Sequence, residues 1–519
     1  MEIKTETSYT KNIKCSDVYT ESSADYSLPD YLGDVRKILF TEASLRPSGR
    51  FAGGDEVEFS GVVVYNVIYL DSENNLSSVE FTSDYDYSVK CSGESYKDSL
   101  SDTRVSNYAI RLVGPRKISA KASLVGSVRL SENSTVSVSG TAFEGESSPE
   151  VNSKSVSIRS SHISSVVERE YAEQVASLEG AIADEVSVIY TFAEAIADSV
   201  IPEGDSAVIK GKLRMSAIVK NEDQPPVSVE KTVAFEESLD FEGISSGMIL
   251  SPRLTVTSIK ASVNPCESGC EIVMNGIVEL CAVGEQNERV DLLLDAYSKN
   301  SPTENSYEDF NYLTLLDSAT VKGTHNGELD RSEIESDSLR EIIIMTATPK
   351  VERVECCDGE VNIFGEIRYS GIASDMNEDV ISYVSIKFSS PFVANVNIDC
   401  QTSENIVIDA RVCAYGASAS LDANKIYASC TLESSVTVCE ERKEKILSSS
   451  QIKEGESYKS SGAKITVYYP SSDDTLFSVA KRFHTSSLKV ARDNDISESV
   501  FASSNPEGKL TGVKKLIIY

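Results

Sequence analysis

Nucleophilic and general-base chemistry would depend in this chain on histidine, the side chain that most often takes a proton from a hydroxyl or thiol nucleophile. The 519 residues contain three histidines, His162, His325 and His484. His162 and His325 stand in polar segments that predict turns, and His484 follows Phe483 at the expected end of a helix. No phosphate-binding loop, strand-linked G-x-G-x-x-G or H-E-x-x-H motif is present. The sequence therefore predicts a protein that is not an enzyme and has no catalytic residues.

Metal binding is the second chemistry that the residue types could support. Eleven cysteines are present, among them the adjacent Cys356 and Cys357 and the pair Cys266 and Cys270. A structural zinc site needs four convergent ligands, and no histidine stands near either cysteine pair. We therefore expect neither a metal nor any other cofactor, and we expect free thiols, as in a reducing cytosol.

The N-terminal composition and the hydropathy favour the same compartment. The first 16 residues alternate charged and polar side chains without the apolar segment of a signal peptide, and no run of 18 apolar residues occurs anywhere. We expect a cytoplasmic protein with no transmembrane segment.

The last 57 residues, 463–519, contain the spacing that most clearly predicts a binding module. Leu476, Val479, Ala480 and Phe483 stand at i, i+3, i+4 and i+7, which builds one apolar helix face. Asp474, just before this run, is expected to be the N-cap. Strands are predicted at 465–469 and 516–518, and a second short helix at 487–493, so the order is strand, helix, helix, strand.

These residues carry a resemblance. The run Asp474-Thr475-Leu476, followed by Val479-Ala480, Phe483, Leu488, Asn494, Leu510, Gly512 and Leu516-Ile517-Ile518, resembles a LysM domain. LysM domains usually bind N-acetylglucosamine polymers such as peptidoglycan or chitin in a shallow groove between two loops. The resemblance implies a small α+β (βααβ) fold and a partner- or glycan-binding site. Its residues would be Asp474, Thr475, Leu476 and Phe477 in the first loop and Asn494, Asp495 and Ile496 in the second.

Two departures from the LysM pattern bear on the ligand. Asp473 replaces the glycine that usually precedes Asp-Thr-Leu, and the segment 494–510 is longer than usual. The chain also lacks tryptophan, although carbohydrate sites commonly stack an aromatic ring on the sugar. Phe477 lies about 100° from the apolar helix face, so we expect an exposed ring suited to a protein contact; the alternative is that Phe477 folds back onto the rest of the chain.

Charge divides the chain into two parts. The formal net charge is −32, but residues 463–519 hold eight basic and six acidic residues, which leaves 41 basic and 75 acidic residues in the remainder. Nucleic-acid binding requires clustered lysine and arginine. No nucleic-acid partner is therefore expected.

The remainder predicts a mainly β protein with a threefold repeat. Three strand-like segments, 57–69, 207–219 and 361–373, carry a glycine at the same place, Gly61, Gly211 and Gly365. A glycine within a strand indicates a bulge or a close backbone approach. The glycine spacing of about 150 residues sets the repeat length. We predict β-rich repeats at 1–150, 151–330 and 331–445, a flexible linker at 446–462 and the small domain at 463–519.

Three β-repeats followed by a LysM-like tail resemble the SipL family of clostridial sporulation proteins, which carry repeated SPOCS domains and a C-terminal LysM domain. The segment 28–39, which begins Leu28-Pro29-Asp30-Tyr31, is similar to the one that introduces the first SPOCS unit. The resemblance implies a non-enzymatic scaffold or adaptor for spore coat assembly in the mother-cell cytosol, at the forespore surface. Its tail would dock onto the coat-basement ATPase SpoIVA.

Two alternatives remain open at this point. One is a cell-wall or spore-envelope protein whose LysM groove binds peptidoglycan. The other is a structural coat component with no dedicated docking partner.

Overall fold

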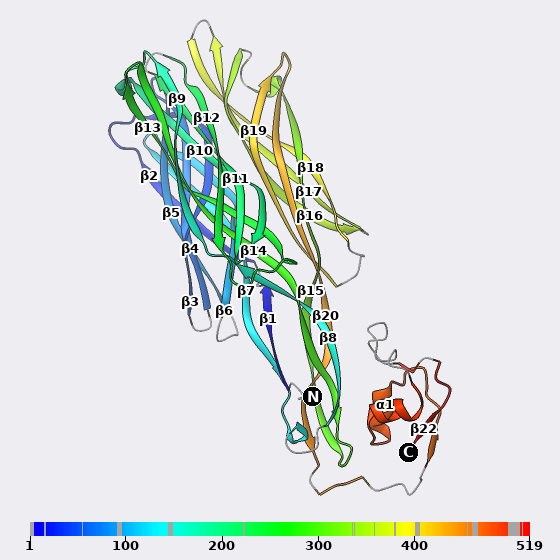
Figure 1. Ribbon diagram of the computed structural model, residues 1–519. Coiled ribbons are helices and arrows are strands. Elements are labelled where there is room, and N and C mark those ends of the chain that lie inside the picture. Colours follow the sequence, from blue (N-terminus) through cyan, green and yellow to red (C-terminus); the bar gives the residue numbers. More distant parts are fainter. Residues whose placement is uncertain are drawn as a thin grey trace.

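The computed structural model describes residues 5–14, 17–53, 56–90, 96–143, 149–221, 224–334, 336, 338–357, 359–377, 380–399, 405–453, 455–458, 465–496, 509–510 and 512–519. The described residues up to Ile452 form a long body of antiparallel strands, and a small tail with two helices follows (Figure 1). The prediction of a mainly β protein is confirmed. Among the described residues, no helix has the length and apolar character needed to cross a membrane.

The body contains three meanders, each a three-stranded antiparallel sheet. Their strands are β3 (Val35–Gly53), β4 (Glu56–Asp71) and β5 (Leu76–Lys90); β10 (Val186–Glu203), β11 (Ser206–Asn221) and β12 (Val227–Asp240); and β16 (Leu339–Cys357), β17 (Glu360–Asn377) and β18 (Val380–Asn397). The alternating Val, Ile, Thr and Tyr side chains of these segments favour strands, since each strand can turn one face inward.

Each meander packs against a second sheet with a long central strand. The central strands are β7 (Lys117–Ser137), β14 (Gly269–Tyr297) and β20 (Lys425–Ile452), and on one side they pair with β6 (Tyr96–Gly114), β13 (Ile249–Cys266) and β19 (Ile406–Leu421). On the other side lie β1 (Glu6–Lys14) with β2 (Val18–Ser27), β8 (Glu150–Ile163) with β9 (Val167–Glu179), and the single strand β15 (Thr303–Asp330). The same two-sheet unit therefore occurs three times. Short 3₁₀ turns lie at Thr141–Phe143, Ala183–Glu185 and Arg331–Glu333.

Two predicted boundaries differ from this pairing. β15, which falls in the predicted second repeat, pairs along its length with β20, so by strand pairing the third unit begins at Thr303 and not at 331. The linker expected at 446–462 is shorter, because β20 continues to Ile452. Both strands are unusually long for a globular protein, and periodicity alone does not tell which sheet a strand joins.

The repeated glycines hold a repeated bulge. Gly61, Gly211 and Gly365 each lie opposite an aromatic side chain on the next strand, and a Cβ added at the glycine would stand 2.7 Å from a ring carbon in every case; the aromatic residues are Tyr85, Phe235 and Phe392. On the other side, the register shifts by one residue directly after the residue paired with each glycine. The bulge and the close approach predicted from the glycines are thus both present, since a side chain at these positions would overlap the ring.

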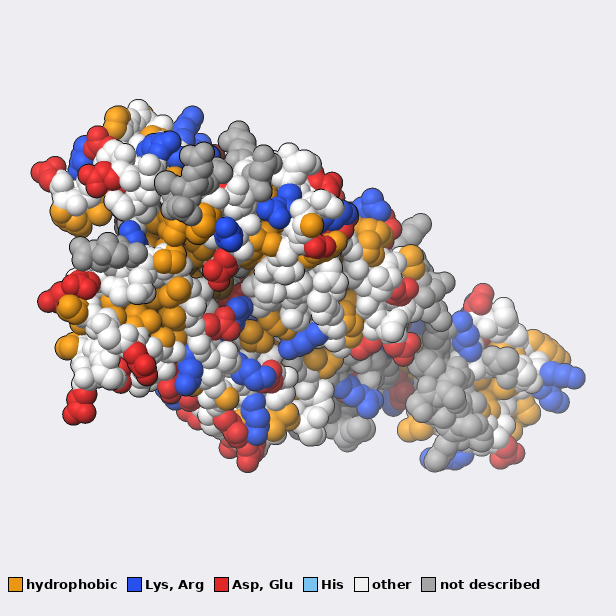
Figure 2. All heavy atoms as spheres, turned by 90° about the horizontal axis from the view of Figure 1, so that it is seen from above, with side chains coloured by type: hydrophobic (Ala, Val, Ile, Leu, Met, Phe, Trp, Pro, Cys, Tyr) orange, Lys and Arg blue, Asp and Glu red, His pale blue; other side chains and the backbone are white. Residues whose placement is uncertain are grey.

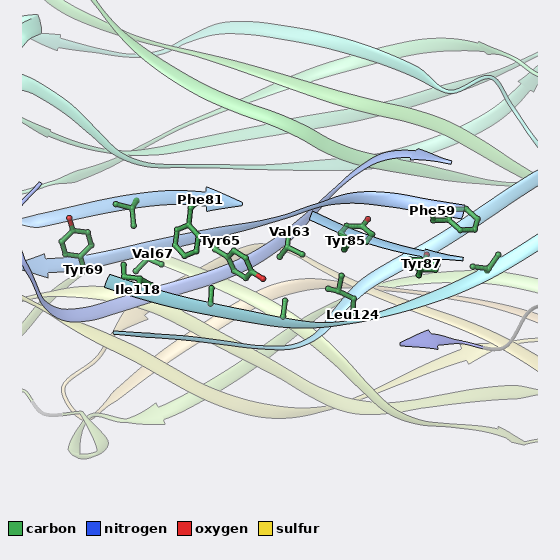
Figure 3. Close-up of a cluster of buried hydrophobic side chains, with 14 of the residues drawn as sticks. Phe59, Val63, Tyr65, Val67, Tyr69, Phe81, Tyr85, Tyr87, Ile118 and Leu124 are labelled. Carbon is green, nitrogen blue, oxygen red and sulfur yellow. The ribbon is translucent and has the colours of Figure 1, made fainter. Parts of the chain in front are cut away.

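Each unit buries its own core between its two sheets. Figure 3 shows the core of the first unit, where Phe59, Tyr65 and Phe81 from the meander face Ile118 and Leu124 of β7. Corresponding cores lie in the second and third units. Burial of side chains of this size contributes about 1.5–3 kcal/mol each.

A further core joins the three units. Ile68, Ile218 and Ile372, each seven residues after the repeated glycine, are at most 1% exposed and belong to one cluster. Opposite them, the bulged residues of a second register shift, Leu39, Ile189 and Ile343, are buried in the same cluster. The three units therefore meet at equivalent positions, and the body is a threefold arrangement around this shared core.

At one end the long strands continue beyond the sandwiches as a narrow stem, formed by β1, β8, the first half of β15 and the C-terminal ends of β7, β14 and β20 (Figure 1). Its own core comprises Val156, Ile158, Val290, Leu292, Phe310, Tyr312 and Ile446. The tail lies beside this stem (Figure 1).

The tail consists of β21 (Thr466–Tyr468), α1 (Leu476–Arg482), α2 (Ser487–Asp493) and β22 (Leu516–Ile518), with β21 and β22 antiparallel. The predicted order of strand, helix, helix, strand is confirmed. Helices of seven residues are marginal alone, so their stability depends on the core that they cover.

Candidate docking site on the tail

The first predicted loop is organised by the carboxylate of Asp474. It accepts hydrogen bonds from the backbone N–H of Ser471 at 2.8 Å and from the hydroxyl of Tyr468 at 2.7 Å. These bonds, the Ser471 N–H first among them, lower the pKa of Asp474. The carboxylate therefore shapes the turn between β21 and α1.

Thr475, not Asp474, is the N-cap of α1, so the helix begins one residue later than predicted. Its hydroxyl accepts from the Ser478 N–H at 3.0 Å, and the Ser478 hydroxyl accepts from the Thr475 N–H at 2.9 Å. This reciprocal capping box satisfies two backbone donors. Leu476, the next predicted site residue, is 2% exposed and lies in the tail core.

The residues predicted for the second loop end α2 and connect it to β22. The amide of Asn494 donates to the carbonyls of Val490 and Ile517 and accepts from the Ile517 N–H at 2.6 Å. Asp495 is exposed and has a positive φ of 52° just after the helix, and Ile496 packs on the tail core. Asn494 and Ile496 thus have structural contacts, and only Asp495 presents its side chain to solvent.

The two loops meet beside Thr475. An isolated bridge pairs Thr475 with Lys509, and the Leu510 N–H donates to the Asp474 carbonyl at 3.0 Å. Residues 497–508 of the long second loop lie outside the described residues.

Phe477 faces the body rather than solvent. Its ring meets that of Tyr297, at the end of β14, edge to face with centroids 5.2 Å apart. The expectation of an exposed Phe477 is therefore wrong, and the alternative that it folds back onto the body is what the structure has. The ring is partly buried and packs against the core cluster that Tyr297 shares with the tail.

Two further contacts hold this side of the tail to the body, and a third joins it to the connection after β20. The Tyr297 hydroxyl donates to the Thr485 carbonyl at 2.6 Å, and burial raises the pKa of Tyr297, so the hydroxyl stays protonated. Lys481, one turn after Phe477, pairs with Asp295 at 2.6 Å. His484 stacks on Tyr458 in the connection that follows β20. Tyr297 is 1% exposed and packs with the tail's own core residues.

The opposite side of the tail is an apolar sheet face. In Figure 1 the helices lie toward the stem and the two strands lie on the far side. Ile465, Val467, Tyr469 and Tyr519 are 57%, 52%, 71% and 58% exposed. Val467 pairs with Ile517, and by alternation these five side chains share one side of the sheet, which we call the outer sheet face.

Cations border the outer sheet face. Lys515 shares the side of Ile517 and Tyr519 by alternation, Lys514 precedes it, and the Lys489 ammonium donates to the Tyr519 carbonyl at 3.2 Å. Figure 2 shows hydrophobic side chains beside lysine and arginine at the edge of the tail that points away from the body. The sequence does not predict this surface, because a strand of three residues does not indicate which of its two sides packs against the rest of the protein.

The histidines do not form a catalytic arrangement. His162 and His325 lie in strands, not in the predicted turns. His162 is 7% exposed, and its Nε2 lies 2.7 Å from the Ser160 hydroxyl and 3.6 Å from a carboxylate oxygen of Glu288, while its Nδ1 has no partner among the described residues. A triad uses the two ring nitrogens for two different partners. Ser160 is also completely buried, so no substrate reaches it.

His325 likewise has structural partners, the Tyr369 hydroxyl at 2.9 Å and the Pro391 carbonyl at 3.1 Å. Within the described part of the chain, no three histidine, cysteine or acidic side chains gather as a metal site would require. The buried thiols of Cys270 and Cys439 form no disulfide.

Comparisons with known proteins add no relative: no family model, no curated protein and no solved structure matches this chain.

Proposed function

We propose that the protein is a non-enzymatic scaffold that helps assemble a spore coat, and that its tail docks onto a coat-basement protein of the SpoIVA type. The support is the order of the parts: three two-sheet β units followed by a βααβ tail, as in the family that the sequence resembles. The chemistry of the described residues agrees with a binding role, since the histidines serve structural contacts.

The outer sheet face is the single observation that carries the docking role. It gathers exposed Val467, Tyr469 and Tyr519 on a small domain whose other side is covered by the stem. Exposed aromatic and aliphatic side chains on a rigid element are typical of protein interfaces. Lys514 and Lys515 border the face, so the partner surface is expected to be acidic around an apolar centre.

This proposal moves the docking surface away from the predicted loops. The polar atoms of Asp474, Thr475 and Asn494 form hydrogen bonds within the tail's own turns and caps. The outer sheet face has no such internal use.

The test compares two sets of substitutions in the full chain. Val467→Ser combined with Tyr469→Ser is expected to weaken binding to the purified coat-basement ATPase at least about tenfold, or about 1.4 kcal/mol. Leu488→Ser is the matched control, because Leu488 is 67% exposed on α2 and lies outside the face. Unchanged binding by the double variant, with folding verified by circular dichroism, would remove the docking role of this face.

Deletion of 463–519 tests the broader proposal in sporulating cells. The truncated body is expected to lose its localisation to the forespore surface. Normal localisation of the truncated chain would contradict the role of the tail as the docking module.

Peptidoglycan binding is a second candidate, favoured by the bridge between Thr475 and Lys509, which places the two loops side by side as a LysM groove requires. Sedimentation of the full chain with purified peptidoglycan separates the two proposals. Retention that survives the Val467→Ser/Tyr469→Ser change but is lost in Asp495→Ala would favour the glycan.

A further inference from the structure

Arginines from all three units converge at one place in the body. Arg129 lies on β7 of the first unit, Arg253 on β13 of the second and Arg411 on β19 of the third. Each interacts electrostatically with the same carboxylate, Asp102 of β6. In a body with a large excess of acidic residues, a meeting of three guanidinium groups is unusual and requires compensation.

Two neighbouring carboxylates are already engaged. Arg129 pairs with Asp409 of the third unit, and it lies 3.6 Å from Glu285 of the second. Glu285 also pairs with the largely buried Arg159. Within the described part of the chain, four guanidinium groups thus share the carboxylates Asp102, Asp409 and Glu285, and Glu433 adds a fourth beside Arg411.

Arg253 is the least compensated of these arginines. Arg253 reaches Asp102 at 3.7 Å, and its buried Nε has no hydrogen-bond partner among the described residues. Burial and the charge of Arg411 lower the pKa of Arg253 to about 10. For Arg411, burial lowers the pKa, but Cys413, Asp102 and Glu433 outweigh burial and raise it; Glu433 also pairs with Lys322 at 2.9 Å.

Solvent reaches this cluster. The side chains of Arg253, Arg129 and Asp102 are 21%, 26% and 50% exposed. A small ion can therefore approach the guanidinium groups from solvent, although their side chains are largely covered. Guanidinium groups bind oxyanions through paired N–H donors, and partial burial strengthens that attraction.

We propose that Arg129, Arg253 and Arg411 form a binding site for a small oxyanion of the phosphate class, which bridges the three units. The anion adds negative charge beside Arg253 and supplies an acceptor for its Nε, while Arg129 and Arg411 complete the site from the other two units. The site goes beyond the docking function, since it lies in the body and involves no tail residue.

The direct test is a calorimetric titration of the full chain with inorganic phosphate, beside thermal unfolding at constant ionic strength with chloride as the balancing anion. Saturable binding and a saturable rise in Tm are expected, because an anion that binds only the folded chain stabilises it. Sulfate serves as a second probe of the same shape. Absence of both the heat and the Tm shift would overturn the proposal.

Substitutions locate the site. Arg411→Gln is expected to abolish the phosphate-dependent rise in Tm, whereas Arg353→Gln, at an exposed position on β16, is expected to retain it. Asp102→Asn removes the competing carboxylate and should tighten phosphate binding several-fold. Equal phosphate effects in wild type, Arg411→Gln and Asp102→Asn would place the ion elsewhere and contradict the assignment, and Asp102→Asn gives this answer even if Arg411→Gln does not fold.

Discussion

The three units of the body share a core to which each gives equivalent side chains, whereas the tail completes its core with a side chain of the body. Ile68, Ile218 and Ile372 meet in the shared core at the same step of the repeat. In the tail, Tyr297 packs with Leu476 and Val479 in a core of nine buried residues. Each unit thus contributes equivalent residues to the shared core, while the core of the tail includes one buried side chain of the body.

This difference has a functional consequence. Because Tyr297 of the body packs into the tail core, the tail has one orientation, with α1 toward the stem and the outer sheet face away from it. A flexible connection would let the tail change its orientation. The contacts of Lys481 with Asp295 and of His484 with Tyr458 restrain the tail instead. The contacts with the stem therefore leave the outer sheet face of the tail exposed.

The largest expected effect comes from removing the Tyr297 side chain from the tail core. Tyr297→Ala should destabilise the tail by about 3–5 kcal/mol, because it removes a buried aromatic ring and the Phe477 contact. Hydrogen exchange should show loss of amide protection in α1 and α2, with protection in β4 and β11 retained.

Tyr427→Ala is the matched control, since Tyr427 is 44% exposed on β20 and touches no tail residue in the described contacts. Tail protection that is unchanged in Tyr297→Ala would show that the tail folds without the body.

The next effect tests the dependence among the units. Gly211→Ala should cost about 1–3 kcal/mol by overpacking, because the added methyl would overlap the ring of Phe235 and the Ile196 carbonyl. The loss should appear in chemical denaturation as a lower midpoint for one cooperative transition. Gly323→Ala is the control, since a Cβ at Gly323 meets nothing within 4 Å.

A separate early transition of the second unit alone would contradict the shared core. It would show that Ile218 is buried beside its equivalents without coupling to them.

The two regions also differ in what their residues reveal. Helical spacing from Leu476 to Phe483 and the strands around it predict the order of the tail elements, because a small domain has one way to bury a single apolar face. In the body, Gly61, Gly211 and Gly365 predict the bulge and the repeat. The unit boundary at Thr303 is not predictable in this way, since strand pairing is decided by contacts far apart in sequence.

Site residues were harder to predict for a related reason. The motif residues Asp474, Thr475 and Asn494 form caps and turns of the tail itself. The outer sheet face, in contrast, is a surface only because no other part of the described chain packs on it. Only the position of the stem, through Tyr297 and Phe477, shows which side of the tail is left open.

The smallest effect concerns acid, and it separates the stem from the tail. Glu288 of β14 accepts from the Thr10 N–H of β1 at 3.3 Å, and it lies beside His162 of β8. The neighbouring His162 ring is the largest of the causes that lower the pKa of Glu288 to about 2 from its ordinary 4.5. A folded-state pKa below the unfolded value means that the carboxylate stabilises the fold above pH 4.5, and that this contribution disappears as the pH falls toward 2.

Glu288→Gln should therefore lower the free energy of unfolding by about 1 kcal/mol at neutral pH, since glutamine keeps one acceptor oxygen but not the charge. The difference from wild type should shrink as the pH falls from 4.5 toward 2, as denaturation midpoints would show. Glu304→Gln, at an exposed position on β15, should leave the pH dependence unchanged. Glu288 joins the first and second units in the stem. If Glu288→Gln and wild type lose the same stability across this range, the Glu288 carboxylate does not couple these two units.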